Sequence, residues 1–332
     1  MSMRNVTDRF FRWAMAGAAV FLVVLLSGCD NTRLTAGIDG SGGPVYAQGP
    51  IQAFGSIVVG GEHYDIASAA ITVNGQPASA DDLALGQIVT VQGQIAGDGS
   101  RVAETVEFDA NLRGPVQSID SGNGVIIAMG QQIRIGPATT IVAGTGNTLD
   151  DLAVGDYVEV SGLVDTGGNV VATRIAQVNP SGELYIIGIA NQVDTAAFTF
   201  SIGDLVVDYS SAGLIEDFPG GGPSNGDLVH AVGSGLDIMG ALTATRLSLV
   251  QSDDSERDGE EAEVEGLITR FVSATDFDVS GRPATTTSDT VYEGGSSADL
   301  QLNVKVQVEG QFDGSNTIVA SKVEVKDGGA VQ

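Results

Sequence analysis

The stretch DLAVGDYVEVSG at residues 151–162 recurs in related form along the chain. It reads DLALGQIVTVQG at 82–93, GPSNGDLVHAVG at 222–233 and DLQLNVKVQVEG at 299–310. In each copy apolar residues alternate with other residues and the copy ends on a glycine, a pattern typical of a strand with one buried face. Repetition at this interval predicts a tandem array of similar units.

Each copy leads into a turn and a second strand, which predicts a hairpin. Turns at 97–99, 165–169 and 313–316 supply Gly, Asp and Asn, which tolerate positive φ. Upstream, each unit offers two or three further strands, and a short polar turn, as at 296–300, separates them from the hairpin. Three strands, a short helical turn and two strands is the order of an OB-like barrel, whose closure removes exposed edges. The repeated glycine fits a bend or bulge where a side chain would clash.

We therefore predict an all-β protein of four tandem OB-like barrels of about 65–70 residues. Units 1 to 4 are expected at 49–111, 112–180, 181–251 and 263–327. Unit 3 departs most from the pattern, since Pro-Gly-Gly-Gly-Pro at 219–223 replaces the Asp-Leu turn, so no helical turn is expected there. If the units contact mainly their sequence neighbours, stability should be distributed along the array, as in quasi-linear repeat proteins.

The N-terminus has the pattern of a targeting segment. Three Arg precede an apolar run at 14–26, which is shorter than the ~20 residues of a typical membrane span. Leu26-Ser27-Gly28-Cys29 then resembles the lipobox of bacterial lipoproteins, in which the Cys thiol receives diacylglycerol. We expect a signal peptide at 1–28, lipid attachment at Cys29 and a flexible tether at 29–48. The alternative, a Cys buried in an uncleaved anchor helix, is disfavoured because the only Cys occupies the position that the lipobox requires.

The charge of the chain excludes several functions. It has 332 residues with 42 acidic and 15 basic side chains, a net charge of -27 that would repel phosphate backbones, so no nucleic-acid partner is expected. One Cys permits neither an internal disulfide nor a Cys-rich metal site. Removal of residues 1–28 takes away three Arg and one Asp, which leaves 12 basic and 41 acidic side chains and a net charge of -29.

The sequence indicates no catalytic residues and no cofactor. The two histidines, His63 and His230, lie in different units and outside any H-E-x-x-H spacing, and His230 is expected on the surface. No G-x-S-x-G elbow and no P-loop occurs in the sequence. A non-catalytic protein is therefore expected.

An acidic stretch at 253–265 contains eight acids and one Arg. Read from Asp254, it places Asp258, Gly259 and Glu265 at positions 5, 6 and 12 of an EF-hand loop, where oxygen ligands and a tight-turning Gly are needed. Strands rather than helices flank it, however, and Glu256 is longer than the usual residue at position 3. We interpret 252–262 as a solvated acidic linker. The alternative is a weak Ca²⁺ site formed by Asp254, Asp258 and Glu265.

Three segments carry a resemblance to a known family: FGSIVV at 54–59, VEVSG at 158–162 with VATRI at 171–175, and EGLITRF at 265–271. They resemble tandem copies of the bacterial domain of unknown function 5666. The resemblance implies a bacterial envelope protein and no catalytic residues.

The expected function is a lipid-anchored spacer or binding module of the bacterial cell envelope, facing the periplasm or the exterior. Its partners would be the membrane, through the anchor, and a glycan or another envelope protein. The alternative is a protein that binds an oligosaccharide or a divalent cation. In this alternative, four aromatic side chains would serve as platforms on which a sugar stacks: Tyr185, Phe198, Phe200 and Tyr209. They occupy apolar positions of expected strands, so we expect them in the core.

Overall fold

The computed structural model describes residues 42–180, 182–250 and 257–326, and within them the chain is all-β. The alternating stretches form strands, and the helical structure in this part of the chain consists of the single-turn 3₁₀ helices η1 (Ala80–Asp82), η2 (Leu149–Asp151) and η3 (Ser297–Asp299). None of the helices in the described ranges has the length and apolar character needed to cross a bilayer.

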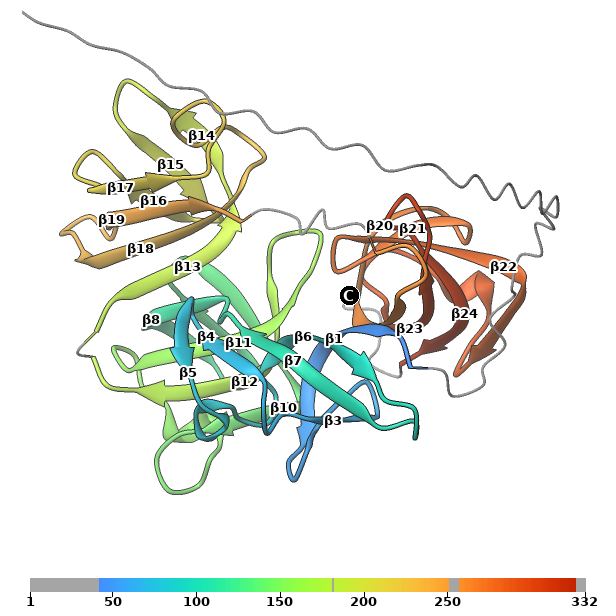
Figure 1. The fold of residues 1–332 in the computed structure, drawn as a ribbon. Helices are drawn as coiled ribbons and strands as arrows, with labels where there is room; N and C mark the ends of the chain where they lie inside the picture. Colours follow the sequence, from blue (N-terminus) through green and yellow to red (C-terminus); the bar gives the residue numbers. More distant parts are fainter. Residues whose placement is uncertain (1–41, 181, 251–256, 327–332) are drawn as a thin grey trace, which may run out of the picture. The chain divides into compact units, whose positions relative to one another are not determined.

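We keep the names units 1 to 4 for four successive groups of strands (Figure 1). Unit 1 contains β1 (Pro44–Ala53), β2 (Ile57–Val59), β3 (Glu62–Asp65), β4 (Ala70–Val73), β5 (Gln76–Ala78), β6 (Ile88–Ile95) and β7 (Arg101–Phe108). Unit 2 contains β8 (Leu112–Asp120), β9 (Val125–Ala128), β10 (Gln131–Val142), β11 (Tyr157–Val164) and β12 (Val170–Val178).

Units 3 and 4 complete the described chain. Unit 3 contains β13 (Leu184–Ile189), β14 (Asn191–Asp194), β15 (Thr199–Ile202), β16 (Leu205–Asp208), β17 (Leu214–Glu216), β18 (Leu228–Leu236) and β19 (Leu242–Leu249). Unit 4 contains β20 (Glu261–Ser273), β21 (Asp276–Val279), β22 (Arg282–Glu293), β23 (Lys305–Phe312) and β24 (Ile318–Val325).

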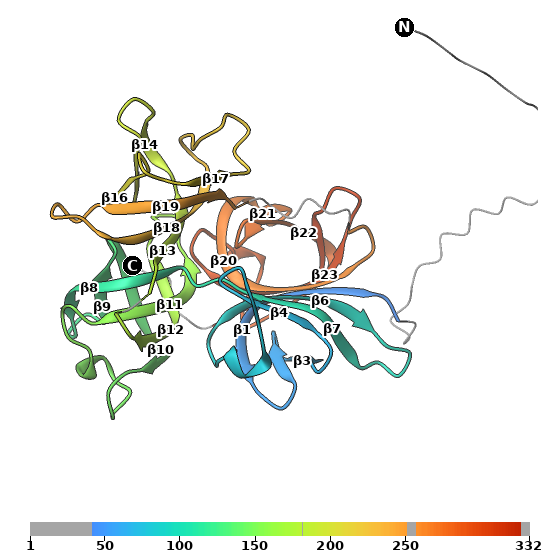
Figure 2. The ribbon, with the colours of Figure 1, turned by 60° about the vertical axis from the view of Figure 1, so that its left-hand side comes forward.

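The strands pair in small barrel-like rings. In unit 4, β20 pairs with both β21 and β23, and β22 and β24 complete the ring through parallel pairing (Figure 1). The strands β8 to β12 of unit 2 curve in the same way (Figure 2), with β8 paired to β9 and β11 and a parallel β10–β12 pair. Unit 1 closes through β1, β2, β3, β7 and β6. Apolar faces that turn inward in these rings are buried without leaving an open sheet edge.

Short capped turns precede the closing hairpin in units 1, 2 and 4. Each 3₁₀ helix carries a capping box, in which Asp82, Asp151 and Asp299 accept hydrogen bonds from the backbone amides of Ser79, Thr148 and Ser296. These bonds satisfy amides that a helix start leaves without an intrahelical partner. Unit 3 has no helix between Asp217 and Asp227, as its Pro- and Gly-rich sequence predicted.

The repeated glycine lies at a β-bulge in every unit. The register shifts at Gly93, Gly162, Gly233 and Gly310, each in the first strand of the closing hairpin. A Cβ at Gly162 or Gly233 would lie 2.5 Å from a carbonyl oxygen of the partner strand, and at Gly93 and Gly310 it would overlap such an oxygen. The glycines are therefore required by the close approach of two backbones.

Two strand pairings join different units. The parallel pair β1–β20 joins unit 1 to unit 4, and β8–β13 joins unit 2 to unit 3. Unit 1 thus contacts the last unit in the sequence, so contacts between units are not restricted to sequence neighbours. Alternation within one unit predicts which face is buried but carries no information about which strand edges pair between units.

Two expected boundaries also shift. Strand β1 begins at Pro44, inside the segment expected to be a tether, because Val45 and Ala47 are buried and the strand pairs with both β6 and β20. The segment expected to be a solvated linker, 252–262, ends in folded structure. Arg257 and Glu260 are buried there and form an ion pair of 2.9 Å, and β20 begins at Glu261.

Candidate functional site

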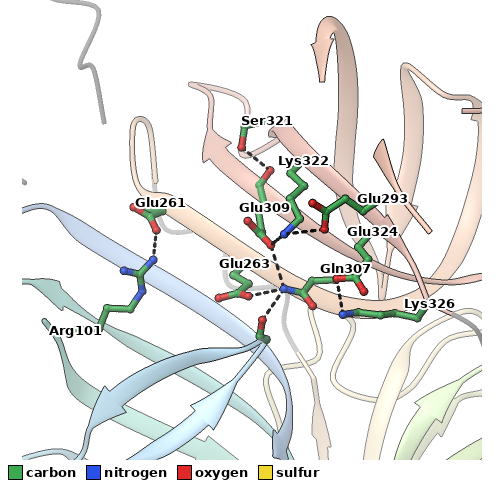
Figure 3. Close-up of polar contacts among 11 residues, drawn as sticks. Arg101, Glu261, Glu263, Glu293, Gln307, Glu309, Ser321, Lys322, Glu324 and Lys326 are labelled. Carbon is green, nitrogen blue, oxygen red and sulfur yellow. Dashed lines mark hydrogen bonds and ion pairs between the residues drawn. The ribbon is translucent and has the colours of Figure 1, made fainter. Parts of the chain in front are cut away.

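A buried polar cluster lies where unit 1 meets unit 4. The amide nitrogen of Gln307, on β23, donates to the carbonyl oxygen of Gly60 and to Oε1 of Glu263, both at 2.6 Å (Figure 3). It also lies 3.2 Å from Oε1 of Glu309. Glu263 and Gln307 are only 5% and 3% exposed. One amide group thus connects two strands of unit 4 to the β2–β3 turn of unit 1.

The environment of Glu263 favours its neutral form. Burial raises the pKa of this carboxyl group to about 8, repulsion from Glu309 and Glu62 adds to the effect, and Arg101 opposes it. The carboxyl group therefore holds its proton near neutral pH, and the cluster avoids an uncompensated buried charge.

Charged pairs surround this cluster. Arg101 of unit 1 forms an ion pair with Glu261 at the start of β20 (Figure 3). Glu265 uses both carboxylate oxygens, one at 2.6 Å from Nζ of Lys305 and the other accepting a hydrogen bond of 3.2 Å from Gln52 of unit 1. Three alternate residues of β20 thus direct carboxyl groups toward unit 1, and two of them, Glu263 and Glu265, are buried.

Tyr46, on β1 of unit 1, belongs to the apolar cluster of unit 4. Its hydroxyl accepts a hydrogen bond of 2.8 Å from Nε of Arg282. The guanidinium groups of Arg257 and Arg282 lie 4.7 and 4.3 Å from the centre of its ring, within the range of cation–π attraction. This side chain contributes to the core of a unit other than its own.

A second polar cluster joins units 1, 2 and 3. The hydroxyl of Tyr185, on β13, donates to Oε2 of Glu159 at 2.5 Å and accepts a hydrogen bond of 2.8 Å from Asn74. Burial is the main cause that raises the pKa of Tyr185, with Glu159 adding to it, so the phenol stays protonated. A residue from each of three units meets at this hydroxyl.

The two histidines lie in different environments. His230, on β18, is half-buried with its ring 6.0 Å from that of Tyr185, so its expected surface position is only partly correct. Burial lowers the pKa of His230, and the carboxylate of Asp109 opposes the shift. His63 is exposed, and its Nδ1 lies 3.0 Å from the hydroxyl of Ser56. The structure shows no contact that joins the two histidines within the described residues.

Three of the four aromatic residues weighed as sugar platforms are core residues. Tyr185, Phe200 and Tyr209 are at most 7% exposed, whereas Phe198 is 50% exposed at the β14–β15 turn. Phe198 packs edge-on against Tyr209 at 5.7 Å.

The structure describes some of the residues predicted to bind lipid or a cation. Cys29 and Asp254 lie outside the described residues. Asp258 is exposed in the turn before β20, and Glu265 is buried within β20 in the contacts with Lys305 and Gln52. Across the described ranges, no group of three or more His, Cys, Asp or Glu side chains is arranged to hold a metal ion.

Unit 2 has a polar hollow of about 750 Å³ near its connection to unit 3. The residues that line it include Arg113, Asp156, Tyr157, Gln177 and Asn179. The guanidinium of Arg113 donates to the carbonyl oxygen of Asn179 at 3.2 Å, which fixes one wall of the hollow.

The model of the family "Domain of unknown function (DUF5666)" matches residues 48–107, 113–176 and 265–324. The chain belongs to the DUF5666 family. The matched segments correspond to units 1, 2 and 4, and unit 3, with its altered turn, lies between the second and third DUF5666 matches.

Comparisons with individual proteins add little to the DUF5666 match. No curated protein matches the chain. A solved structure, "drosophila Unr CSD456", aligns at 15% identity over 67% of this chain and 98% of its own length, with a TM-score of 0.17. So low a score carries no argument about this DUF5666 protein.

Sequence reasoning missed the polar residues that connect the units. Gln307 alternates with apolar residues in the stretch that predicts β23, and Glu263 belongs to the acidic stretch 253–265 that the sequence predicts to be solvated. Both residues are buried by unit 1, which pairs with their unit through β1 and β20. The sequence of unit 4 alone therefore gives no sign that they are buried.

We predict that Ca²⁺ and Mg²⁺ at equal ionic strength raise the melting temperature alike. Both ions screen the repulsion among carboxylates of a strongly acidic chain, whereas a Ca²⁺ site would prefer the ion that accepts more oxygen ligands. Thermal unfolding followed by circular dichroism in each salt measures the shift. A Ca²⁺-selective shift that disappears in Asp258→Asn would contradict the prediction and favour the cation-binding alternative.

Proposed function

We propose that this protein is a lipid-anchored, non-catalytic component of the bacterial cell envelope whose four OB-like barrels act together as a spacer or binding module. The strand order in units 2 and 4 supports the OB-like barrel. In each of them the first strand pairs with the second and the fourth, and the third strand runs parallel to the fifth. In unit 3 the strands β13 and β14, separated only by Ala190, take the place of one long first strand.

The buried links between units carry the proposal. The side chains that depart from the repeated apolar scaffold, such as Gln307, Tyr46 and Tyr185, are engaged in holding one unit to another. Their hydrogen bonds would be lost if the units separated, and buried polar groups left without partners cost about 1 to 3 kcal/mol each. These links hold the units together in one body. A spacer needs this property, because it must keep its length under load.

Anchoring is tested at Cys29. The change Cys29→Ala removes the thiol that would receive the acyl chains, so we expect loss of the lipid and accumulation of a precursor that retains residues 1–28. Metabolic labelling with a radioactive fatty acid, followed by electrophoresis and intact-mass measurement, detects both effects. Label retained by the Ala variant would rule out Cys29 as the attachment site.

The hollow in unit 2 supports a second candidate function, binding of an oligosaccharide. A lining that combines polar residues with a tyrosine suits a sugar, which offers many hydroxyl groups and apolar C–H faces. A thermal-shift screen of the full chain against soluble oligosaccharides tests this function, with Gln177→Ala as the variant that alters the hollow and Gln132→Ala as the matched control. A shift that Gln177→Ala weakens and Gln132→Ala preserves would favour this function over a ligand-free spacer.

A further inference from the structure

The tip of the β18–β19 hairpin in unit 3 presents two large apolar side chains to solvent. Ile238 is 100% exposed and Met239 is 85% exposed. Both lie between Asp237 and Gly240 at the turn, so they make no contribution to the core of unit 3.

The equivalent hairpins have the same turn with different tips. In unit 3, Oδ1 of Asp237 accepts hydrogen bonds of 2.8 and 2.9 Å from the amides of Met239 and Ala241. Asp313 of unit 4 accepts bonds of 2.8 and 3.0 Å from the residues two and four positions later. Asp165 of unit 2 does the same at 2.8 Å. The two tip residues are Thr-Gly in unit 2 and Gly-Ser in unit 4, at 166–167 and 314–315.

Folding of the turn therefore does not require Ile238 and Met239. Three hairpins of one chain show that small or polar residues satisfy the same geometry, including the Gly-Asp pair at 97–98 of unit 1. Two adjacent apolar side chains that are almost entirely exposed are unfavourable in water, so their presence indicates a contact with something outside this fold.

One further exposed apolar side chain lies near the base of the hairpin. Val207 of β16 pairs with Leu242 at the base of the hairpin, and its neighbour Val206 is 43% exposed. A stable protein–protein interface buries roughly 800 Å² on each partner, more than two side chains and one neighbour present. A lipid bilayer requires no complementary pocket and accepts a small apolar projection.

We propose that the β18–β19 hairpin tip inserts Ile238 and Met239 into the interfacial region of a lipid bilayer. This inference rests on the proposed function, because the lipid at Cys29 supplies the primary attachment. Fourteen residues separate Cys29 from Pro44, which at full extension hold the start of β1 within about 50 Å of the membrane. At the high effective concentration that results, a weak second contact is enough to orient the body.

The charge of unit 3 identifies the kind of surface. Residues 182–250 contain eight acidic side chains and one Arg, so an anionic lipid surface would repel this unit. A bilayer of zwitterionic lipids has no net surface charge and would not repel this unit.

A tryptophan probe tests the insertion. The only Trp of the chain is Trp13, inside the segment expected to be cleaved, so a tryptophan placed in the mature chain is a unique fluorophore. Met239→Trp in the full lipidated protein is compared with Ser315→Trp, the equivalent tip position in unit 4. Both proteins are reconstituted in phosphatidylcholine vesicles with and without bromine-labelled acyl chains, and intact mass confirms lipidation and cleavage.

We expect the Met239→Trp emission to move to shorter wavelength and to be quenched several-fold more strongly by brominated lipid than that of Ser315→Trp. Replacing a third of the lipid with phosphatidylglycerol should weaken the quenching. A lipidated, vesicle-bound Met239→Trp protein that is not quenched overturns the insertion and leaves the anchor in place. Emission that shifts without quenching also overturns it and assigns the tip to a protein contact, whereas a chain found without lipid overturns the proposed function and the insertion with it.

Discussion

Gly310→Ala is expected to lower the free energy of unfolding of unit 4 by about 1 to 3 kcal/mol. The added Cβ would overlap the backbone carbonyl oxygen of Val319 on the paired strand and would lie 3.0 Å from Cα of Ala320. Backbone atoms in a closed ring cannot move aside as a flexible side chain can, so the strain must separate β23 from β24. Urea unfolding of the full chain, followed by hydrogen exchange of the β23 and β24 amides, measures the loss.

Gly314→Ala is the matched control for this change. It lies four residues later, in the turn of the same hairpin, where no atom lies within 4 Å of an added Cβ. We expect its effect on unfolding to be small. Equal losses in the two variants would show that the bulge at Gly310 does not require glycine.

Glu263→Gln is expected to make stability less dependent on pH. The carboxyl pKa is about 8 in the folded protein against an ordinary value of 4.5, so between these values the folded state holds a proton that the unfolded chain releases. Stability from this group is therefore present at low pH and is lost as pH rises through about 8. Since each pKa unit corresponds to about 1.4 kcal/mol, the loss is roughly 3 to 5 kcal/mol across the whole range.

The Gln variant removes the titrating group and keeps an oxygen to accept the hydrogen bond from Gln307. We expect it to be more stable than the original protein at pH values above about 8 and closely similar at low pH. Chemical unfolding at a series of pH values measures both curves, with Glu104→Gln, at an exposed position of β7, as the control. If the original protein and Glu263→Gln lose stability in parallel as pH rises, general repulsion among carboxylates explains the slope and the burial of Glu263 does not.

Local structure could be predicted from the sequence because its causes are local. The alternation at 304–309 predicted β23, the polar turn near 296–300 contains η3, and the repeated glycine lies at the bulge in every unit. Each of these depends on residues only a few positions apart or on one paired strand. The expectation that four aromatic residues belong to the core is confirmed for Tyr185, Phe200 and Tyr209 and is wrong for Phe198, which is 50% exposed at a turn.

The contacts between units could not be predicted in the same way. An outward position on a strand meets water in an isolated barrel, but Glu263 and Glu265 meet unit 1 instead. The alternation of apolar and polar residues is the same whether the outer face of a strand meets water or another unit. It therefore does not distinguish these two environments. Val45 and Ala47 were likewise expected in a tether, although they pair with a strand of the last unit.

The β1–β20 pair also bears on how the protein is made. Gln307 and Gly60 are hydrogen-bonded across 247 positions of the chain, so this contact closes a very long loop. Contacts of such high sequence separation slow folding, since most of the chain must be ordered before they can form. A polypeptide that emerges from its N-terminus first would therefore expose the free edge of β1 until unit 4 has appeared. During synthesis, that uncovered edge is an unpaired strand edge at which two nascent chains can pair.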